Sequence, residues 1–291
     1  MPESPEVQIL AEELDAALAG RTITDVDVIE FRVTKTRARP LTSLVGGKIA
    51  RVTRHGKLID LALDGEAGHL VVSLGRHGWA RWADDGDDAD DAGAATTAAD
   101  EPPPPALVEI TFDDGRTLLL TDAGDFVSLG GWIVDDPFEV PAVAKLGPDP
   151  AADEFSQADF DAATVGRRKQ VKAVLQEQES LAGIGNAYSD EILHAAKVSP
   201  VGHAAALADD ERERLYRVTV DEIRSAIDAR RGIPIDKLKG AKVAAMRVHG
   251  LAGEPCPRCG DTIRDFTFGS TTAQYCPTCQ TDGAVLPLRE A

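Results

Sequence analysis

Among the first twenty residues, apolar side chains recur every three or four positions, which is the period of a helix. Ser4 is placed to cap the first turn, Pro5 suits the first helical position, and Gly20 suits the end of the segment. We therefore expect a helix over residues 5–19. Its apolar stripe is formed by Val7, Leu10, Leu14 and Leu18.

After this helix, apolar and polar residues alternate with a period of two. The alternating segments are short and are separated by turn residues, and Asp113-Asp114-Gly115 is a typical hairpin turn. Several short strands with turns between them predict a β-sandwich or barrel of about 130 residues. The predicted strand segments are 22–29, 48–63, 69–82, 106–122 and 128–134.

The second half of the chain returns to helical periodicity. A proline-rich crossing without periodicity, residues 145–155, marks the change. The pattern predicts helices over 156–164, 167–178, 185–198 and 209–231. The expected fold class is α+β, with a leading helix and β-sandwich over 1–140, a helical domain over 141–250 and a metal-binding hairpin over 251–285.

Composition is that of a globular protein, with 43% hydrophobic and 27% charged residues among 291. No apolar run reaches the 18 residues that a membrane span requires. The first residues lack the basic and apolar parts of a signal peptide, so we expect a cytoplasmic protein.

The net charge of −18 at first argues against a nucleic-acid partner, because DNA binding depends on Lys and Arg. Residues 84–101, however, carry eight of the acids and no base, and four prolines follow. We interpret 84–105 as a disordered, solvated insert. Basic residues gather at 166–172 and between Arg230 and Arg247, where a local basic face could still bind phosphate.

All four cysteines lie close together, in two CPxC pairs. Each pair can direct two thiolates at one point, and a tetrahedral zinc ion needs two such pairs. Two disulfides or four free thiols are the alternatives, and the spacing and expected compartment favour one structural Zn²⁺. Four cysteines leave no open coordination position for catalysis. The predicted ligands are Cys256, Cys259, Cys276 and Cys279.

A glycine turn precedes one of the predicted helices. Gly183 and Gly185 form the turn, and Asn186 stands at the start of the helix. Backbone N–H groups at a helix N-terminus can bind a phosphate, and the preceding segment is basic. A simple αα-hairpin with a glycine cap fits the same residues equally well.

Three elements in this order resemble the formamidopyrimidine-DNA glycosylase / endonuclease VIII family of DNA repair enzymes. They are MPESPEV at the start, QESLAGIGNAYSDE at the glycine turn, and the terminal RVHGLAGEPCPRCG with YCPTCQ. The resemblance covers essentially the whole chain. It implies a helix–two-turn–helix domain, a zinc finger, and a monomer that binds damaged double-stranded DNA at the nucleoid.

The resemblance also implies the chemistry. Removal of Met1 would free the amine of Pro2 as the nucleophile of a bifunctional glycosylase and abasic-site lyase. An α-amino group has a pKa of roughly 8, so part of it is neutral near pH 7. Glu3 matches the carboxylate that handles protons at the sugar, and Glu6 matches a second family carboxylate with a structural role.

DNA contacts are implied at four further positions. Lys57, expected on a strand, matches a residue that contacts the phosphate beside the lesion, although a solvent-facing lysine is the simpler interpretation. Asn186 matches the phosphate-gripping residue of the glycine turn. Arg76 and Phe126 match positions that fill the space left by an everted base.

The chain departs from the family pattern at several of these positions. Thr271 stands where the family carries an arginine in the zinc hairpin, and Asp125 replaces another DNA-contacting arginine. Arg76 takes the place of an apolar wedge. Oxidised purines, oxidised pyrimidines and abasic sites all stay open as substrates. A non-catalytic relative that binds lesions or DNA ends is the main alternative, and a zinc-ribbon adaptor is a more distant one.

Overall fold

The computed structural model describes residues 1–65, 67–83, 104–268 and 271–287. Almost all of the predicted acidic insert, 84–105, lies outside these residues. The chain forms two compact units, and the α+β fold class is confirmed. The predicted division into three parts stays a prediction. The first unit consists of Met1–Pro2, Val7–Ala144 and Ile233–Leu238, and the second of Glu3–Glu6, Lys145–Gly232 and Lys239–Ala291.

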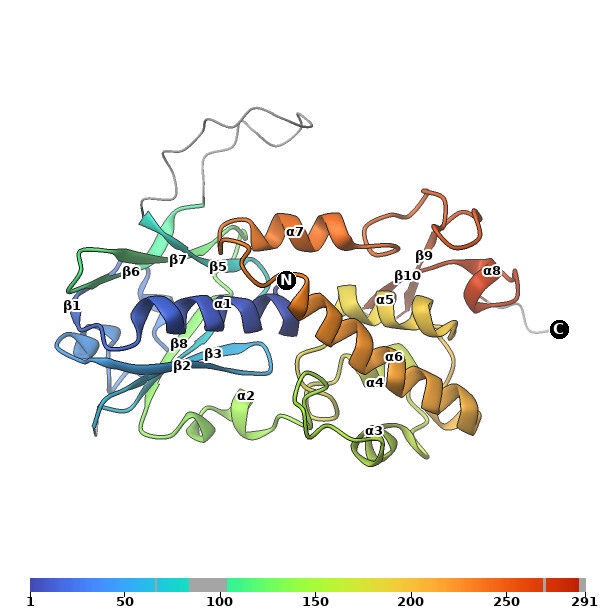
Figure 1. The fold of residues 1–291 in the computed structure, drawn as a ribbon, viewed down its shortest axis with the longest axis horizontal. Helices are drawn as coiled ribbons and strands as arrows, with labels where there is room; N and C mark the ends of the chain where they lie inside the picture. The colour runs from blue at the N-terminus through green and yellow to red at the C-terminus, as the bar shows by residue number, and fades with distance from the viewer. Residues whose placement is uncertain (66, 84–103, 269–270, 288–291) are drawn as a thin grey trace. The chain divides into compact units, whose positions relative to one another are not determined.

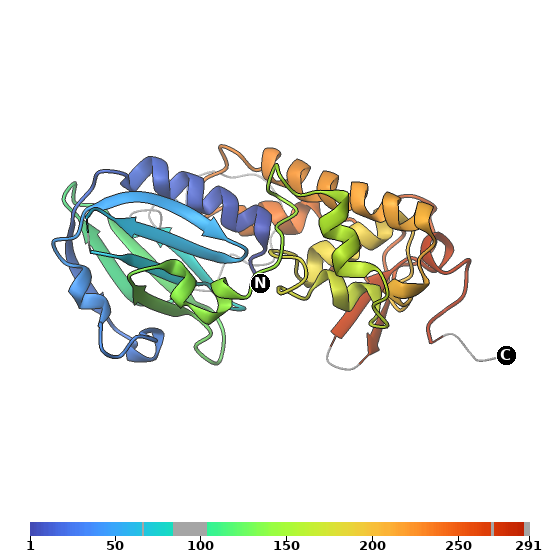
Figure 2. The ribbon, with the colours of Figure 1, turned by 90° about the horizontal axis from the view of Figure 1, so that it is seen from below.

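The first unit contains two antiparallel sheets of four strands (Figures 1 and 2). One has the order β1-β6-β7-β5, with strands Ile23–Val28, Ala106–Phe112, Thr117–Asp122 and Gly78–Trp82. The other has the order β2-β3-β4-β8, with strands Ile49–His55, Leu58–Leu63, His69–Ser73 and Gly130–Val134. Segment 69–82, predicted as one strand region, divides between the sheets at a turn around Gly75, whose φ is +58°.

Both faces of the second sheet are buried. On one face Leu58, Val71 and Val134 pack against Val140 and Val143, which belong to the segment with the short helix α2 (Pro141–Ala144). Neighbouring residues point to the opposite face, because side chains alternate along a strand. This face is also apolar and is formed by Ile59, Leu61, Leu70, Val72 and Ile133.

Helix α1 spans Ser4–Leu18, and its predicted apolar stripe is fully buried. The predicted capping role of Ser4 is wrong. Ser4 is the first helical residue, and its buried hydroxyl has no hydrogen-bond partner among the described residues. Instead the carboxylate of Glu6 accepts from the backbone N–H of Glu3 at 3.2 Å. The start of α1 is therefore stabilised by the carboxylate of Glu6.

The second unit is helical and ends in a hairpin. Ser156 caps α3 through a reciprocal bond pair with Asp159. Helix α6 buries a stripe at four-residue spacing, Leu215, Thr219, Ile223 and Ile227. The elements are α3 (Gln157–Thr164), α4 (Val171–Leu175), α5 (Asn186–Ala196), α6 (Asp209–Asp228), α7 (Leu238–Ala245), β9 (Arg264–Phe268), β10 (Thr271–Tyr275) and α8 (Pro277–Gln280).

Two helix predictions in this unit need correction. Only Val171–Leu175 of the predicted segment 167–178 is helical. The backbone before it is engaged elsewhere, because Val171 N–H donates to Gly202 and Ala204 N–H donates to Lys169. Helix α7 was not predicted at all. No helix in the described part of the chain is long and apolar enough to cross a membrane.

Candidate active site

Glu3 lies at the N-terminus of helix α5, within the second unit. Its carboxylate accepts hydrogen bonds from the backbone N–H groups of Gly185 at 2.5 Å, Ala187 at 3.0 Å and Tyr188 at 3.3 Å. The N–H of Ser4 donates to the carbonyl of Gly183 at 2.9 Å. An anion at a helix N-terminus is stabilised by these donors and by the helix dipole. The start of the chain is thus fixed by the glycine turn.

Gly185 permits this approach because it lacks a side chain. A Cβ at this position would lie 2.6 Å from Cδ of Glu3, closer than any real contact. The φ of Gly185 is −126°, which every residue adopts, so its backbone conformation does not require glycine. The close contact alone explains the residue type.

Glu3 and Glu6 share a buried cluster of charges. Nζ of Lys242 lies 3.1 Å from an oxygen of each carboxylate. Glu6 also accepts a hydrogen bond from the hydroxyl of Tyr188 at 2.8 Å and lies 3.4 Å from Nε of Arg230. Burial, together with the charge of Glu6, raises the pKa of Tyr188. The two carboxylates raise the pKa of Lys242 despite its burial.

This arrangement corrects the expected use of the glycine turn. The helix N-terminus was expected to offer backbone N–H groups to a phosphate, and three N–H groups there donate to Glu3 instead. Asn186 is the first residue of α5, and its side-chain oxygen accepts from Nε2 of Gln176 at 3.0 Å. A phosphate contact of Asn186 stays a prediction.

The basic segment before the turn is largely paired with acids. Arg167 and Lys169 both contact Glu177, each at 2.6 Å. These two contacts and the hydroxyl of Ser180 lower the pKa of Glu177 to about 2. Lys172 is fully buried and lies 2.5 Å from Asp190. The predicted basic helix therefore presents less free charge than its sequence suggests.

Pro2 and Lys57 both belong to the first unit. Pro2 is buried directly before α1, while the side chain of Met1 is exposed. Lys57 does not lie on a strand, contrary to expectation. It lies in the turn between β2 and β3, where Gly56 has a φ of +57°, and it is half-buried. The catalytic role of Pro2 and the phosphate contact of Lys57 stay predictions.

Arg76 and Phe126 lie on two loops that contact each other. The backbone N–H of Arg76 donates to the hydroxyl of Ser128 at 3.0 Å. Asp122 holds the second loop, because its carboxylate accepts from the N–H groups of Gly124, Ser128 and Leu129. Burial alone would raise the pKa of Asp122, but these bonds lower it.

The tips of these loops carry side chains of different character. Phe126 is 85% exposed, and Arg76 and Asp125 are exposed beside it. At this loop tip the ring of Phe126 is accessible to a binding partner. The wedge roles of Arg76 and Phe126 stay predictions, as does the repulsive effect of Asp125.

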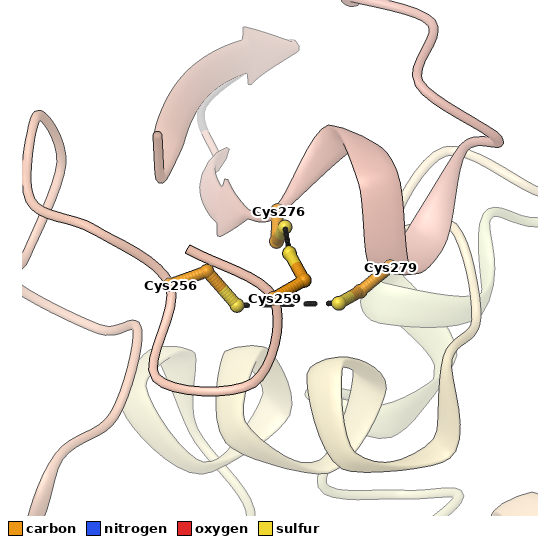
Figure 3. A group of neighbouring side chains, drawn as sticks. All are labelled: Cys256, Cys259, Cys276 and Cys279. Atoms are coloured by element: carbon orange, nitrogen blue, oxygen red, sulfur yellow. Dashed lines mark hydrogen bonds between the residues drawn. The ribbon is translucent and has the colours of Figure 1, made fainter. Parts of the chain in front are cut away.

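The four cysteines come together at the end of the chain (Figure 3). Their Sγ atoms all lie within 4.8 Å of one another, with 4.0 Å between Cys256 and Cys279 and 3.4 Å between Cys259 and Cys276. Tetrahedral zinc with four thiolates places its sulfurs roughly 3.8 Å apart. The cluster fits one Zn²⁺. Thr271 is the first residue of β10 and pairs with Phe268 of β9.

Two buried acids of α5 bind this hairpin and the segment directly before it, and sequence analysis missed both. Asp190 accepts from Nδ1 of His249 at 2.8 Å and from the N–H of Gln274 at 3.1 Å. Glu191 accepts from the N–H groups of Arg247, Val248 and His249. Two adjacent acids directly before the apolar residues Ile192 and Leu193 were the available signal, because buried carboxylates need several donors.

Lys242, Tyr188 and Arg230 were also missed as members of the site. Tyr188 lies inside the glycine-turn motif, so its position could have been suspected. Lys242 and Arg230 come from distant segments, and only the fold brings them to Glu3 and Glu6. From the sequence alone, Lys242 and Arg230 cannot be told from solvent-exposed cations.

Three family models match the chain. The formamidopyrimidine-DNA glycosylase N-terminal domain matches residues 1–129, and the H2TH domain of that enzyme matches residues 146–236. The zinc finger found in FPG and IleRS matches residues 253–281. Together with the sulfur cluster, the last match confirms the prediction of one structural zinc.

Curated and solved relatives cover the same length. The formamidopyrimidine-DNA glycosylase of Heliobacterium modesticaldum is 33% identical and covers 96% of this chain and 100% of its own. The MutM (FPG) structure from Thermus thermophilus is 28% identical, covers 96% and 98%, and has a TM-score of 0.76. Lactococcus lactis FPG (MutM) bound to FAPY-dG containing DNA is 25% identical, covers 96% and 100%, and has a TM-score of 0.80.

Proposed function

The chain belongs to the formamidopyrimidine-DNA glycosylase / endonuclease VIII family, and from this premise we propose that it is a DNA repair glycosylase. It removes a damaged base from double-stranded DNA and then nicks the strand at the abasic site. The observation that carries the proposal is the fixed position of Glu3 against α5, immediately after Pro2. A catalytic terminus has to be held in place, and this one is.

The reaction begins at the amine of Pro2, once Met1 has been removed. Its lone pair attacks C1′ of the damaged nucleotide, and the glycosidic bond breaks as the base leaves with the bonding electrons. The nitrogen of Pro2 then loses its proton, the C1′–O4′ bond of the sugar breaks as O4′ takes up a proton, and the covalent product is a ring-opened iminium (Schiff base) on C1′. Loss of a proton from C2′ then lets the C3′–O bond break, and water releases Pro2 from the sugar.

Glu3 exchanges protons with the sugar during these steps. Its hydrogen bonds stabilise the ionised carboxylate, which suits a proton acceptor. Lys57 and Asn186 contact phosphates near the lesion, and Arg76 and Phe126 fill the space of the everted nucleotide. The exposure of Phe126 supports the last role. Zinc holds the terminal hairpin and takes no part in bond cleavage.

Trapping of the Schiff base tests the proposal. Purified protein, with removal of Met1 verified by mass, is incubated with abasic-site DNA and borohydride. We expect a covalent adduct that maps to the nitrogen of Pro2 by peptide mass spectrometry. Pro2→Ala, which turns the secondary amine into a primary one, should reduce adduct formation about tenfold or more.

Pro5→Ala is the matched control, since Pro5 lies inside α1. Its adduct yield should equal that of the unchanged protein. If the correctly processed protein gives no adduct, or one that maps away from Pro2, the lyase assignment is wrong. A panel of oxidised purines and pyrimidines in the same assay then identifies the preferred base.

A second candidate is a non-catalytic protein that binds lesions or DNA ends. The exposed Asp125 beside Phe126 favours it, because a carboxylate next to phosphates weakens DNA binding and the positioning of a substrate. This candidate predicts binding to abasic-site DNA without an adduct.

A further inference from the structure

Lys242 lies on α7 and reaches the carboxylates at the start of the chain. Its Nζ is 3.1 Å from Oε1 of Glu3 and 3.1 Å from Oε2 of Glu6. We propose that Lys242 is a positioning residue for Glu3, which keeps this carboxylate ionised and oriented during the reaction. The inference rests on the proposed function and deepens it.

The geometry leaves Glu3 with donors from two sides. The N–H groups of α5 contact both oxygens, and Lys242 adds a full positive charge at Oε1, the oxygen that also accepts from Ala187. The side chains of Lys242 and Glu3 are 12% and 2% exposed. Charge-assisted bonds between buried groups are short, directional and weakly screened by solvent. Lys242 therefore fixes both the position and the charge of Glu3.

The surrounding groups make this role specific to Lys242. Glu6 lies on α1, Tyr188 on α5, and Arg230 follows α6, where it lies 3.4 Å from Glu6. Lys172 of α4 is engaged by Asp190 and acts on Glu3 only from a distance. Lys242 is joined to Glu3 directly by an ion pair.

Loss of this cation has a defined consequence. Glu3 and Glu6 are neighbours that currently share one ammonium. Without it, two buried carboxylates face each other, and one of them takes up a proton more readily. A protonated Glu3 cannot accept a proton from the sugar. Activity should then require a higher pH.

Lys242 is not itself the nucleophile. The two carboxylates raise the pKa of its ammonium, so it carries no lone pair near neutral pH. This separates its role from that of Pro2. Adduct formation at Pro2 and the contribution of Lys242 can therefore fail independently.

The test compares pH–rate profiles under single-turnover conditions on abasic-site DNA, using the full chain with zinc. For Lys242→Met we expect the acid limb of the profile to move up by about one pH unit, with at least about a tenfold lower rate below it. Lys242→Arg keeps the charge and should leave the limb within a few tenths of a unit of the unchanged protein. Lys237→Met, the same substitution at an exposed position just before α7, should leave the profile unchanged.

A double-mutant comparison isolates the pair. Because Lys242 acts through Glu3, Glu3→Gln with Lys242→Met should be no slower than Glu3→Gln alone. If Lys242→Met does not fold, Lys242→Gln replaces it in the profile. An unshifted acid limb in the folded variant, or additive losses in the double variant, would overturn the inference. An unchanged protein that forms no Pro2 adduct would instead overturn the proposed function.

Discussion

At the scale of single residues, Gly185 shows how closely the start of the chain is packed. Its missing side chain leaves room for the carboxylate of Glu3, with no demand on its backbone conformation. Three hydrogen bonds depend on this room. The glycine turn and the start of α5 therefore bind the carboxylate of Glu3 directly through backbone N–H groups.

Gly185→Ala tests this packing. We expect a loss of about 2–4 kcal/mol in the free energy of unfolding, because the added methyl displaces a buried carboxylate from its donors. The rate of strand nicking should fall as well. Urea unfolding and single-turnover assays measure the two effects.

Gly202→Ala is the matched control, since its Cβ would make only ordinary contacts at 3.5 Å and beyond. Its stability should stay within about 0.5 kcal/mol of the unchanged protein. Equal behaviour of the two variants would contradict the close packing at Gly185.

Residue-level prediction from sequence worked where one residue carries its own signal. The spacing of the cysteines predicts the metal site, and the apolar stripe of α1 predicts which face of the helix is buried. The partners of Glu3 and Glu6 could not be predicted this way. From the sequence, Lys242 and Arg230 cannot be told from solvated cations, and Ser4 cannot be told from an N-cap although it is the first residue of the helix.

At the scale of elements, Glu177 neutralises the basic segment before the glycine turn. It contacts Arg167 and Lys169 and belongs to the loop that follows α4. Glu177→Gln should free both cations for DNA. We expect tighter binding and a slope of log K against log salt that is steeper by about two, since each cation that meets a phosphate contributes roughly 0.9.

The same substitution has a pH signature. The pKa of Glu177 is lowered to about 2 from an ordinary 4.5, so its stabilising effect is present above pH 4.5 and is lost as pH falls toward 2. Glu177→Gln should therefore lose less stability than the unchanged protein in this window. The difference in lost stability between the two proteins is at most about 1 kcal/mol, because the ion pairs are partly exposed.

Glu179→Gln is the control for both measurements, since Glu179 forms only a long, exposed pair with Lys145 at 3.7 Å. Its salt slope and acid unfolding should match the unchanged protein. An unchanged salt slope in Glu177→Gln would mean that Arg167 and Lys169 do not meet DNA.

The zinc hairpin is an element with little core of its own. The buried cluster at the metal site consists of Val248, Ile263 and two of the cysteines, and the other buried apolar residues of this segment are Ala273, Tyr275 and Leu286. A fold with so few apolar contacts depends on its metal. Cys259→Ser, or removal of zinc by a strong chelator, should release about one zinc per chain and weaken DNA binding about tenfold or more.

Zinc content by atomic emission and DNA binding by fluorescence anisotropy measure these losses. Arg258→Gln, a change inside the same knuckle at a position that is no ligand, should keep its zinc. Full DNA binding by the zinc-free protein would show that the hairpin does not contact DNA.

At the scale of the whole molecule, the class of fold could be predicted from the sequence better than the long-range contacts between its elements. Alternating strands and periodic helices appear where expected, because burial on one face imposes the pattern. The division of 69–82 between two sheets and the shortening of 167–178 depend on long-range backbone contacts, as between Val171 and Gly202. A local pattern carries no signal for such contacts.

The overall charge of the chain is a further whole-molecule property. Eight of its acids lie in 84–101, so their replacement by serine would change the net charge from −18 to −10. We expect association with DNA to become about threefold faster or more at low salt, with little difference at high salt. Stopped-flow association kinetics measure this, and an insert with the same acids in shuffled order is the control. Equal rates at low salt would mean that the insert exerts no long-range repulsion.

The anchoring of Glu3 by residues near Gly185 and Lys242 also bears on biosynthesis. The ribosome makes Pro2 and Glu3 first, and nearly two hundred residues follow before the α5 anchor exists. In the folded chain Pro2 is buried. The proposed function requires removal of Met1, and because Pro2 is buried once the chain has folded, we expect this removal to take place on the nascent chain, before α5 holds the terminus.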